Sequence, residues 1–173
     1  MTSVWIEVSL PDQALRWSVA GGDSITYRVS TARNGPGERQ GTGCTPRGLH
    51  RVRARIGEGE PPGTVFIGRR PTGEIYDASL ARRHSGRDWI LTRILWLCGE
   101  EPGRNRLGSV DSMRRFIYIH GCPESEPMGV PRSAGCIRMH EAAILDLFER
   151  TPVGTPVRIH EQALSEPPAR RSG

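Results

Sequence analysis

Alternation of apolar and polar residues is the dominant pattern along this chain, and it predicts a protein built mainly from short β-strands. In residues 4–8 and 25–29 every second residue is apolar, and in residues 49–56 apolar side chains alternate with Arg. Such alternation indicates one buried and one solvated face. Further strands are expected at residues 13–19, 64–68, 74–76, 116–120 and 155–159.

Helical periodicity is convincing in one segment, residues 140–149, where Ile144, Leu147 and Phe148 fall on one face. Pro152 then ends the helix. The apolar run 89–97 fits a buried strand or a short helix, because periodicity does not separate the two for so short a run.

The length of 173 residues fits one domain, which we place at residues 1–160. Residues 161–173 are rich in Pro, Ser, Arg and Glu, and we expect them to form a disordered tail. A hydrophobic content of 36% favours a soluble globular protein, and 21 Gly with 14 Pro favour many turns.

The net charge of +5 is carried almost entirely by Arg. These Arg residues are spread along the chain without a basic run or a basic helix, so we expect no nucleic-acid partner. The charge instead suits attraction of substrates that carry carboxylates.

The N-terminal residues lack the pattern of a secretory signal, and no stretch is long enough for a transmembrane helix. The four Cys show no CxxC spacing. We therefore expect a cytoplasmic protein with reduced thiols and no membrane partner. A periplasmic location is the alternative, if the chain is a fragment or is exported by another route.

The strongest chemical signal lies in residues 118–139, where fifteen residues separate His120 from Cys136. A thiolate attacks carbonyl carbon, and His has the pKa of a base that can generate it near neutral pH. Gly135 lets the chain turn sharply before the Cys, so that the N–H groups of Gly135 and Cys136 can form an oxyanion hole. The helix expected next should lower the pKa of the thiol.

Residues around this pair are expected to contact substrate. Arg138 can hold a carboxylate through two hydrogen bonds. Tyr118 shares a strand face with His120 and is expected to line the site, together with Ser133 and Gly121. Phe116, also on that face, is expected to pack in the core.

Cys122 leaves two alternatives open. It could pair with Cys136 in a disulfide that reversibly blocks the nucleophile, or it could be a small residue in a loop. Together with His120, Cys136 and His140 it could also form a zinc site, although the spacing matches no common zinc motif. We expect no metal and no cofactor.

The residues His120-Gly121 and Ser133-Ala134-Gly135-Cys136-Ile137-Arg138 resemble the signature of the YkuD family of L,D-transpeptidases. The resemblance continues through residues 45–48 (Thr-Pro-Arg-Gly) and 154–157 (Gly-Thr-Pro-Val). It implies a mainly β fold, a curved sandwich-like or barrel-like sheet with one main helix after the catalytic Cys. Ala134 departs from the family, which often has His there, and leaves His120 as the only base.

The resemblance also implies an enzyme that acts on peptidoglycan tetrapeptide stems or muropeptides. Cys136 would attack the bond between the third residue, often meso-diaminopimelate, and the terminal D-Ala, with His120 as base and then acid. A backbone carbonyl or a hydroxyl, not located in the sequence, would orient His120.

Two fates of the acyl-enzyme are possible. The cytoplasmic expectation favours hydrolysis, which is L,D-carboxypeptidase activity in peptidoglycan recycling. The alternative is L,D-transpeptidation, which cross-links the third residues of two cell-wall stems. A non-catalytic peptidoglycan-binding module is a further alternative, but binding alone needs no thiol.

Overall fold

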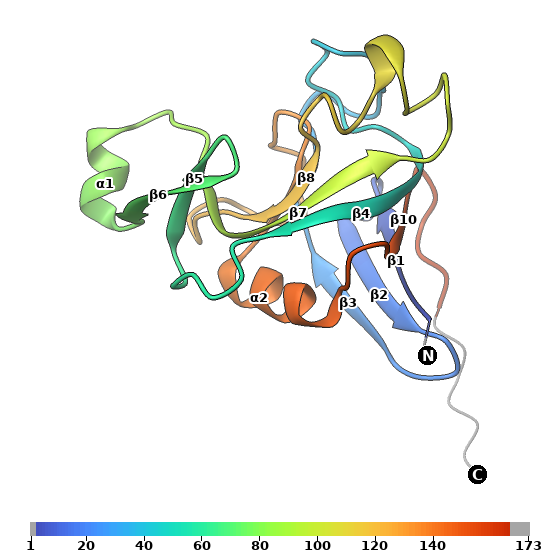
Figure 1. Cartoon of the computed structure of the whole chain (residues 1–173), viewed down its shortest axis with the longest axis horizontal. Helices are drawn as coiled ribbons and strands as arrows, with labels where there is room; N and C mark the ends of the chain where they lie inside the picture. Colours follow the sequence, from blue (N-terminus) through green and yellow to red (C-terminus); the bar gives the residue numbers. More distant parts are fainter. Residues whose placement is uncertain (1–2, 167–173) are drawn as a thin grey trace.

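The computed structural model describes residues 3–166 and, within them, contains one ten-stranded sheet and two α-helices (Figure 1). The expectation of a mainly β fold is confirmed. The strands are β1 (Val4–Ser9), β2 (Ala14–Val19), β3 (Ser24–Arg28), β4 (Gly48–Ile56), β5 (Thr64–Ile67), β6 (Arg70–Ile75), β7 (Ile90–Gly99), β8 (Tyr118–Gly121), β9 (Ile137–Met139) and β10 (Pro156–His160). The helices are α1 (Ala78–Arg83) and α2 (Glu141–Arg150), with a 3₁₀ turn η1 (Gly108–Val110).

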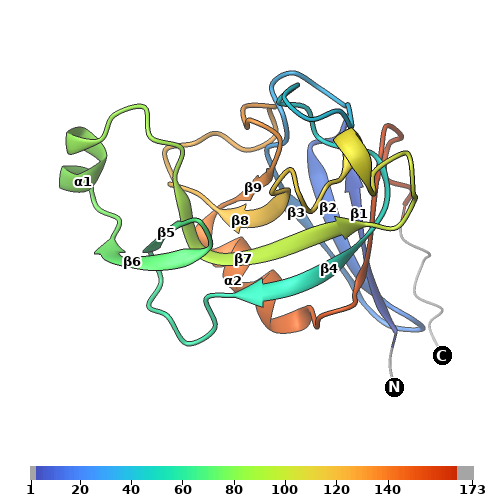
Figure 2. The same cartoon turned by 45° about the horizontal axis from the view of Figure 1, so that its top comes forward.

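The sheet is mixed and curled, with the strand order β3-β2-β1-β10-β4-β7-β5-β6 (Figure 2). β8 branches from β7, and β9 pairs with β8. The β1–β10 and β8–β9 pairs are parallel, and the other pairs are antiparallel. The long strand β7 contacts β4, β5 and β8 and so links the two ends of the sheet to the strand that carries His120.

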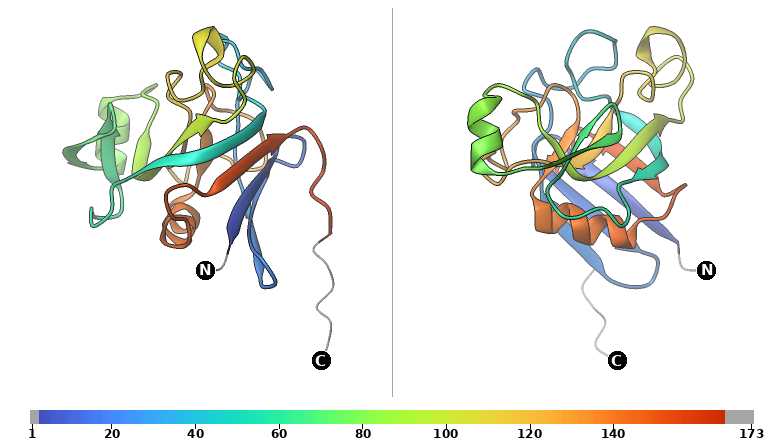
Figure 3. Two further views of the ribbon diagram at one scale, coloured as in Figure 1. Left: turned by 45° about the vertical axis from the view of Figure 1, so that its right-hand side comes forward. Right: turned by 60° about the vertical axis from the view of Figure 1, so that its left-hand side comes forward.

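Helix α2 packs beneath the curled sheet and fixes the strands that carry the site (Figure 3). Ile144, Leu147 and Phe148 are fully buried and share one core cluster with Ile119 of β8 and Ile137 of β9. Deleting a side chain such as that of Phe148 from a packed core costs roughly 3 to 5 kcal/mol. The predicted helix is therefore confirmed, and its apolar face supports β8 and β9.

The run expected as either a strand or a helix is strand β7. Both of its faces are buried, since Leu91, Ile94, Leu95 and Leu97 are almost inaccessible to solvent. A central strand covered on both sides reads as a continuous apolar run, which explains the ambiguity of the sequence.

Helix α1, which the sequence did not predict, lies at the far end of the hairpin β5–β6 (Figure 1). Asp77 caps it by accepting a hydrogen bond from the Leu80 N–H over 2.7 Å. Leu80 packs with Val65, Trp89 and Leu91 in a small second core. A six-residue helix is too short to show periodicity, but the Asp cap was a usable signal.

Two sequence expectations need correction. Residues 161–166 are not a detached tail: Ser9 Oγ donates to the Gln162 carbonyl over 2.6 Å, and Leu164 N–H donates to Asp12 over 2.8 Å. The rest of the expected tail, residues 167–173, lies outside the described residues. Phe116 is not a core residue, because 51% of the residue is exposed. None of the helices between residues 3 and 166 has both the length and the apolar content needed to cross a lipid bilayer.

Candidate active site

The parallel pairing of β8 with β9 places the catalytic candidates on one face. His120 lies opposite Arg138, and Ile119 lies opposite Ile137. Since side chains alternate along a strand, His120 and Arg138 project to the face opposite the buried Ile119 and Ile137. Cys136 immediately precedes β9 and lies beside Tyr118, whose N–H contacts its sulfur.

The Cys136 thiol is held by two backbone groups of the neighbouring segment. Its S–H donates to the Phe116 carbonyl over 3.2 Å, and the Tyr118 N–H donates to Sγ over 3.3 Å. Burial raises the pKa of Cys136 to about 12, against a smaller opposing effect of the Tyr118 N–H. At neutral pH the side chain of Cys136, the candidate nucleophile, is therefore a thiol.

The expected lowering of the Cys136 pKa by a following helix is wrong. Strand β9 (Ile137–Met139) separates Cys136 from α2, which begins at Glu141. The field of a helix terminus falls off within about one turn. The thiol therefore lies in a strand environment and is not at a helix N-terminus.

His120 is oriented by the carbonyl of the next residue. Its Nδ1 lies 2.7 Å from the Gly121 oxygen, which can only accept, so Nδ1 carries the proton. The imidazole is 1% exposed, and burial lowers its pKa. The ring is therefore neutral near pH 7, with Nε2 as proton acceptor, and Gly121 supplies the orienting group that the sequence did not reveal.

Ser133 and Thr45 brace the loop that carries Cys136. Ser133 Oγ donates to the Cys136 carbonyl over 2.5 Å and accepts from the Gly135 N–H over 3.2 Å. Thr45 Oγ1 donates to the Gly135 carbonyl over 2.9 Å. Ser133 thus acts as a buried brace, and in this arrangement the Gly135 N–H is engaged by it instead of pointing to an oxyanion. The role of the Cys136 N–H in an oxyanion hole stays a prediction.

Gly135 is required by its surroundings. Its φ of +135° favours Gly, and a Cβ there would lie 3.2 Å from the Cys44 carbonyl oxygen. Arg115 donates to that same Cys44 oxygen over 2.7 Å and to the Glu38 carbonyl over 3.0 Å. Arg115, which sequence reasoning missed, thereby fixes the loop against which the Cys loop packs.

Arg138 is held in ion pairs. Its guanidinium lies 2.8 Å from Asp88 and 3.4 Å from Glu126, and its side chain is only 12% exposed. Asp88 precedes β7 and Glu126 follows β8, so Arg138 joins two loops beside the site. The expected two-point grip on a substrate carboxylate would have to displace one of these partners. Sequence reasoning missed both acids, which come from loops without any motif.

Comparison with known proteins identifies the family of this chain. Residues 3–159 match the family model described as YkuD, the L,D-transpeptidase catalytic domain. The chain belongs to this family.

The solved structures that resemble this L,D-transpeptidase domain share its fold at low sequence identity. L,D-transpeptidase 3 from Mycobacterium tuberculosis is 16% identical with a TM-score of 0.57, over 92% of this chain and 62% of that one. Bd1075 of Bdellovibrio bacteriovorus is 16% identical with a TM-score of 0.56, over 92% and 49%. The Bacillus subtilis (strain 168) protein YqjB is 47% identical over 45 residues, which is 26% of each chain. This chain therefore spans less than two thirds of these relatives.

Cys122 of the L,D-transpeptidase domain lies away from Cys136, the candidate nucleophile. Its N–H continues the ladder by donating to the Met139 carbonyl over 2.9 Å. Tyr118 is the neighbour of Cys136, and Cys122 lies four residues further along the chain. Four residues of a strand span about 13 Å. A disulfide cannot span that separation. Both thiols are free, so the structure does not bring the proposed redox pair together.

The alternative zinc site is not assembled. Within residues 3–166 no group of three His, Cys, Asp or Glu side chains is placed to hold a metal ion. His140 is turned to the loop after β8, where Nε2 donates to the Glu126 carbonyl over 2.7 Å and Nδ1 lies 3.3 Å from Glu124.

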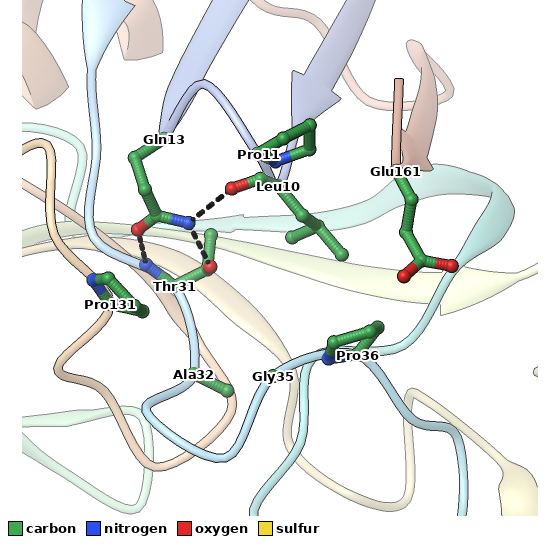
Figure 4. A pocket seen from close by; sticks show the side chains of 9 residues that line it. All are labelled: Leu10, Pro11, Gln13, Thr31, Ala32, Gly35, Pro36, Pro131 and Glu161. Carbon is green, nitrogen blue, oxygen red and sulfur yellow. Dashed lines mark hydrogen bonds between the residues drawn. The ribbon is translucent and has the colours of Figure 1, made fainter. Parts of the chain in front are cut away.

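A separate pocket of about 260 Å³ lies between the β1–β2 turn and the segment that follows β3 (Figure 4). Gln13 forms a polar wall and is satisfied by Thr31 and the Leu10 carbonyl. None of the predicted site residues lines it; the lining consists of Leu10, Pro11, Gln13, Thr31, Ala32, Gly35, Pro36, Pro131 and Glu161. The candidate chemistry therefore belongs to the face of β8 and β9.

Proposed function

We propose that this domain catalyses cysteine-dependent acyl transfer on peptidoglycan tetrapeptide stems. The observation that supports it most is the placement of the partly buried thiol of Cys136 and the neutral imidazole of His120 on one face of β8 and β9. Family membership supports the reaction class. The scissile bond would join the third residue of the stem to its terminal D-Ala.

The resting site does not hold a preformed ion pair. Burial raises the pKa of Cys136 and lowers that of His120, so the neutral thiol and neutral imidazole are the stable forms. The proton therefore moves as the sulfur attacks the carbonyl carbon, with His120 Nε2 as general base. The hydrogen bond from Nδ1 to the Gly121 carbonyl stabilises the imidazolium that forms.

Collapse of the tetrahedral intermediate completes acylation. The C–N bond to D-Ala breaks, and the imidazolium returns its proton to the leaving amine. An acyl-thioester on Cys136 remains. Water or an amine of a second stem then attacks it, with His120 again as base.

Hydrolysis of this acyl-enzyme, in preference to cross-linking, remains a prediction made from the sequence. The cytoplasmic location also stays a prediction, and cell fractionation checks it. No residue of the described site selects water over an amine.

Product analysis tests the proposal. Purified protein is incubated with a disaccharide tetrapeptide, with and without an added amine acceptor, and the products are identified by mass spectrometry. Release of D-Ala alone supports hydrolysis, and a cross-linked dimer supports transpeptidation. Unchanged substrate in both reactions would refute the proposed function.

A further inference from the structure

Arg69 lies across a group of aromatic rings beside the nucleophile. It occupies the turn between β5 and β6 with a φ of +65°. Its guanidinium carbon lies 4.4 Å from the centre of the Trp96 ring and 4.9 Å from that of Phe116. Its Nη1 donates to the Tyr118 hydroxyl over 2.9 Å. Stacking and one hydrogen bond thus hold the guanidinium in a defined plane.

The same residues contact the catalytic sulfur. Phe116 presents its ring to Arg69 and its carbonyl to Cys136 Sγ. Tyr118 binds Arg69 through its hydroxyl and binds Sγ through its backbone N–H. Arg69 and Cys136 are therefore separated by about the length of one Tyr side chain, on a surface made of Trp96, Phe116 and Tyr118.

Arg69 differs from Arg138 in its charge environment. Arg138 is paired with Asp88 and Glu126, whereas no carboxylate of residues 3–166 forms an ion pair with Arg69. A guanidinium has five N–H donors, and ring stacking leaves its edge open to a planar acceptor. A carboxylate is the acceptor that fits this edge through two parallel hydrogen bonds.

We propose that Arg69 binds the side-chain carboxylate of the third stem residue while that residue is attacked by Cys136. This inference rests on the proposed function. The carboxylate of the leaving D-Ala is attached one carbon beyond the scissile nitrogen, so it stays near the sulfur. The position of Arg69, at the far end of the Tyr118 side chain, fits a long side chain that ends in a carboxylate. Trp96 and Phe116 cover its methylene groups.

The proposal assigns specificity to Arg69. Tetrapeptides with meso-diaminopimelate as third residue carry this carboxylate, whereas Lys lacks it and the amidated diaminopimelate carries a neutral amide in its place. The enzyme should therefore prefer the acidic third residue, and the preference should depend on Arg69.

The test measures kcat and KM for D-Ala release from these three tetrapeptides by wild type, Arg69→Met and Arg69→Lys. We expect Arg69→Met to lower kcat/KM on the diaminopimelate peptide by roughly 10- to 100-fold, mainly through KM. For the amidated and Lys peptides, kcat/KM should change less than about twofold. Arg69→Lys should keep part of the kcat/KM that Arg69→Met loses on the diaminopimelate peptide. Arg70→Met, at an exposed neighbouring position, is the matched control and should leave all three unchanged.

An equal loss on all three peptides would overturn the proposal, because Arg69 would then only support Tyr118 and Phe116. Binding of the same peptides to Cys136→Ala protein, with and without Arg69→Met, separates this result from a failure of the proposed function. Selective loss of binding of the diaminopimelate peptide supports the Arg69 site even if wild type releases no D-Ala. If Cys136→Ala protein that retains Arg69 binds the three peptides equally well, the Arg69 proposal is overturned.

Discussion

His120 Nδ1 donates to the Gly121 carbonyl over 2.7 Å, and this bond sets the tautomer of the imidazole. A carbonyl oxygen only accepts, so the proton of the neutral ring lies on Nδ1 and the lone pair on Nε2. The candidate base is therefore oriented by the backbone of its own strand, and no carboxylate within residues 3–166 forms an ion pair with it.

Gly121→Ala should reduce activity through this strand. A Cβ at residue 121 would clash with the Leu91 carbonyl oxygen and lie 3.1 Å from Ile144 Cγ2, so β8 must shift. We expect a loss of stability of roughly 1 to 3 kcal/mol and a fall in kcat of about tenfold or more, because the shift moves His120. Urea denaturation and steady-state kinetics measure the two effects. Wild-type kcat in this variant would contradict the predicted need for this strand position.

The rate at which iodoacetamide alkylates Cys136 should increase steadily with pH and should not reach a plateau near neutral pH. A pKa of about 12 leaves only a trace of thiolate at pH 7, and this fraction grows about tenfold per pH unit. The rate is followed by peptide mass spectrometry from pH 6 to 10, with Cys136→Ala as background. A plateau below pH 8 would indicate a preformed thiolate–imidazolium pair.

Asp88→Asn should make Cys136 more reactive. The negative charge of Asp88 raises the pKa of Cys136 directly. Asp88 also pairs with Arg138, whose positive charge lowers the pKa of Cys136. Because Asp88 is half exposed, we expect only a two- to fivefold faster alkylation at pH 8, about the strength of a surface ion pair. Glu58→Gln, which removes an exposed partner of Arg55 elsewhere, is the control. A slower reaction in Asp88→Asn would contradict the electrostatic argument.

His50 should make stability depend on pH. It is buried between the Gly48 carbonyl and Ser112 Oγ, and burial lowers its pKa from 6.5 to about 4. The unfolded chain therefore binds the proton first, so stability is complete above pH 6.5 and falls as the pH drops toward 4. The loss is on the order of 3 kcal/mol. Urea denaturation at pH 7.5, 5.5 and 4.5 should show a shallower dependence in His50→Gln, and an unchanged dependence would contradict this.

The sequence predicted those features that depend on local pattern. Alternation predicted the strands, and the positions of Ile144, Leu147 and Phe148 predicted α2. Strand β9 was missed because three residues show no period, and the wrong helix-dipole argument for Cys136 followed from that omission.

Partners that come from distant loops were not predictable in this way. Asp88, Glu126 and Arg115 reach the site only through the tertiary fold, and no local motif marks them. Phe116 was misplaced because β8 begins only at Tyr118, after a backbone turn that leaves the Phe116 ring exposed.

The most direct test of the account compares D-Ala release from a tetrapeptide stem by Cys136→Ala and Cys122→Ala. Each variant removes one sulfur atom, and circular dichroism checks that both are folded. Since Cys136 alone of the two is placed as nucleophile, we predict that Cys136→Ala loses all release above background while Cys122→Ala keeps activity within a few-fold of wild type. Substantial release by Cys136→Ala would contradict the account.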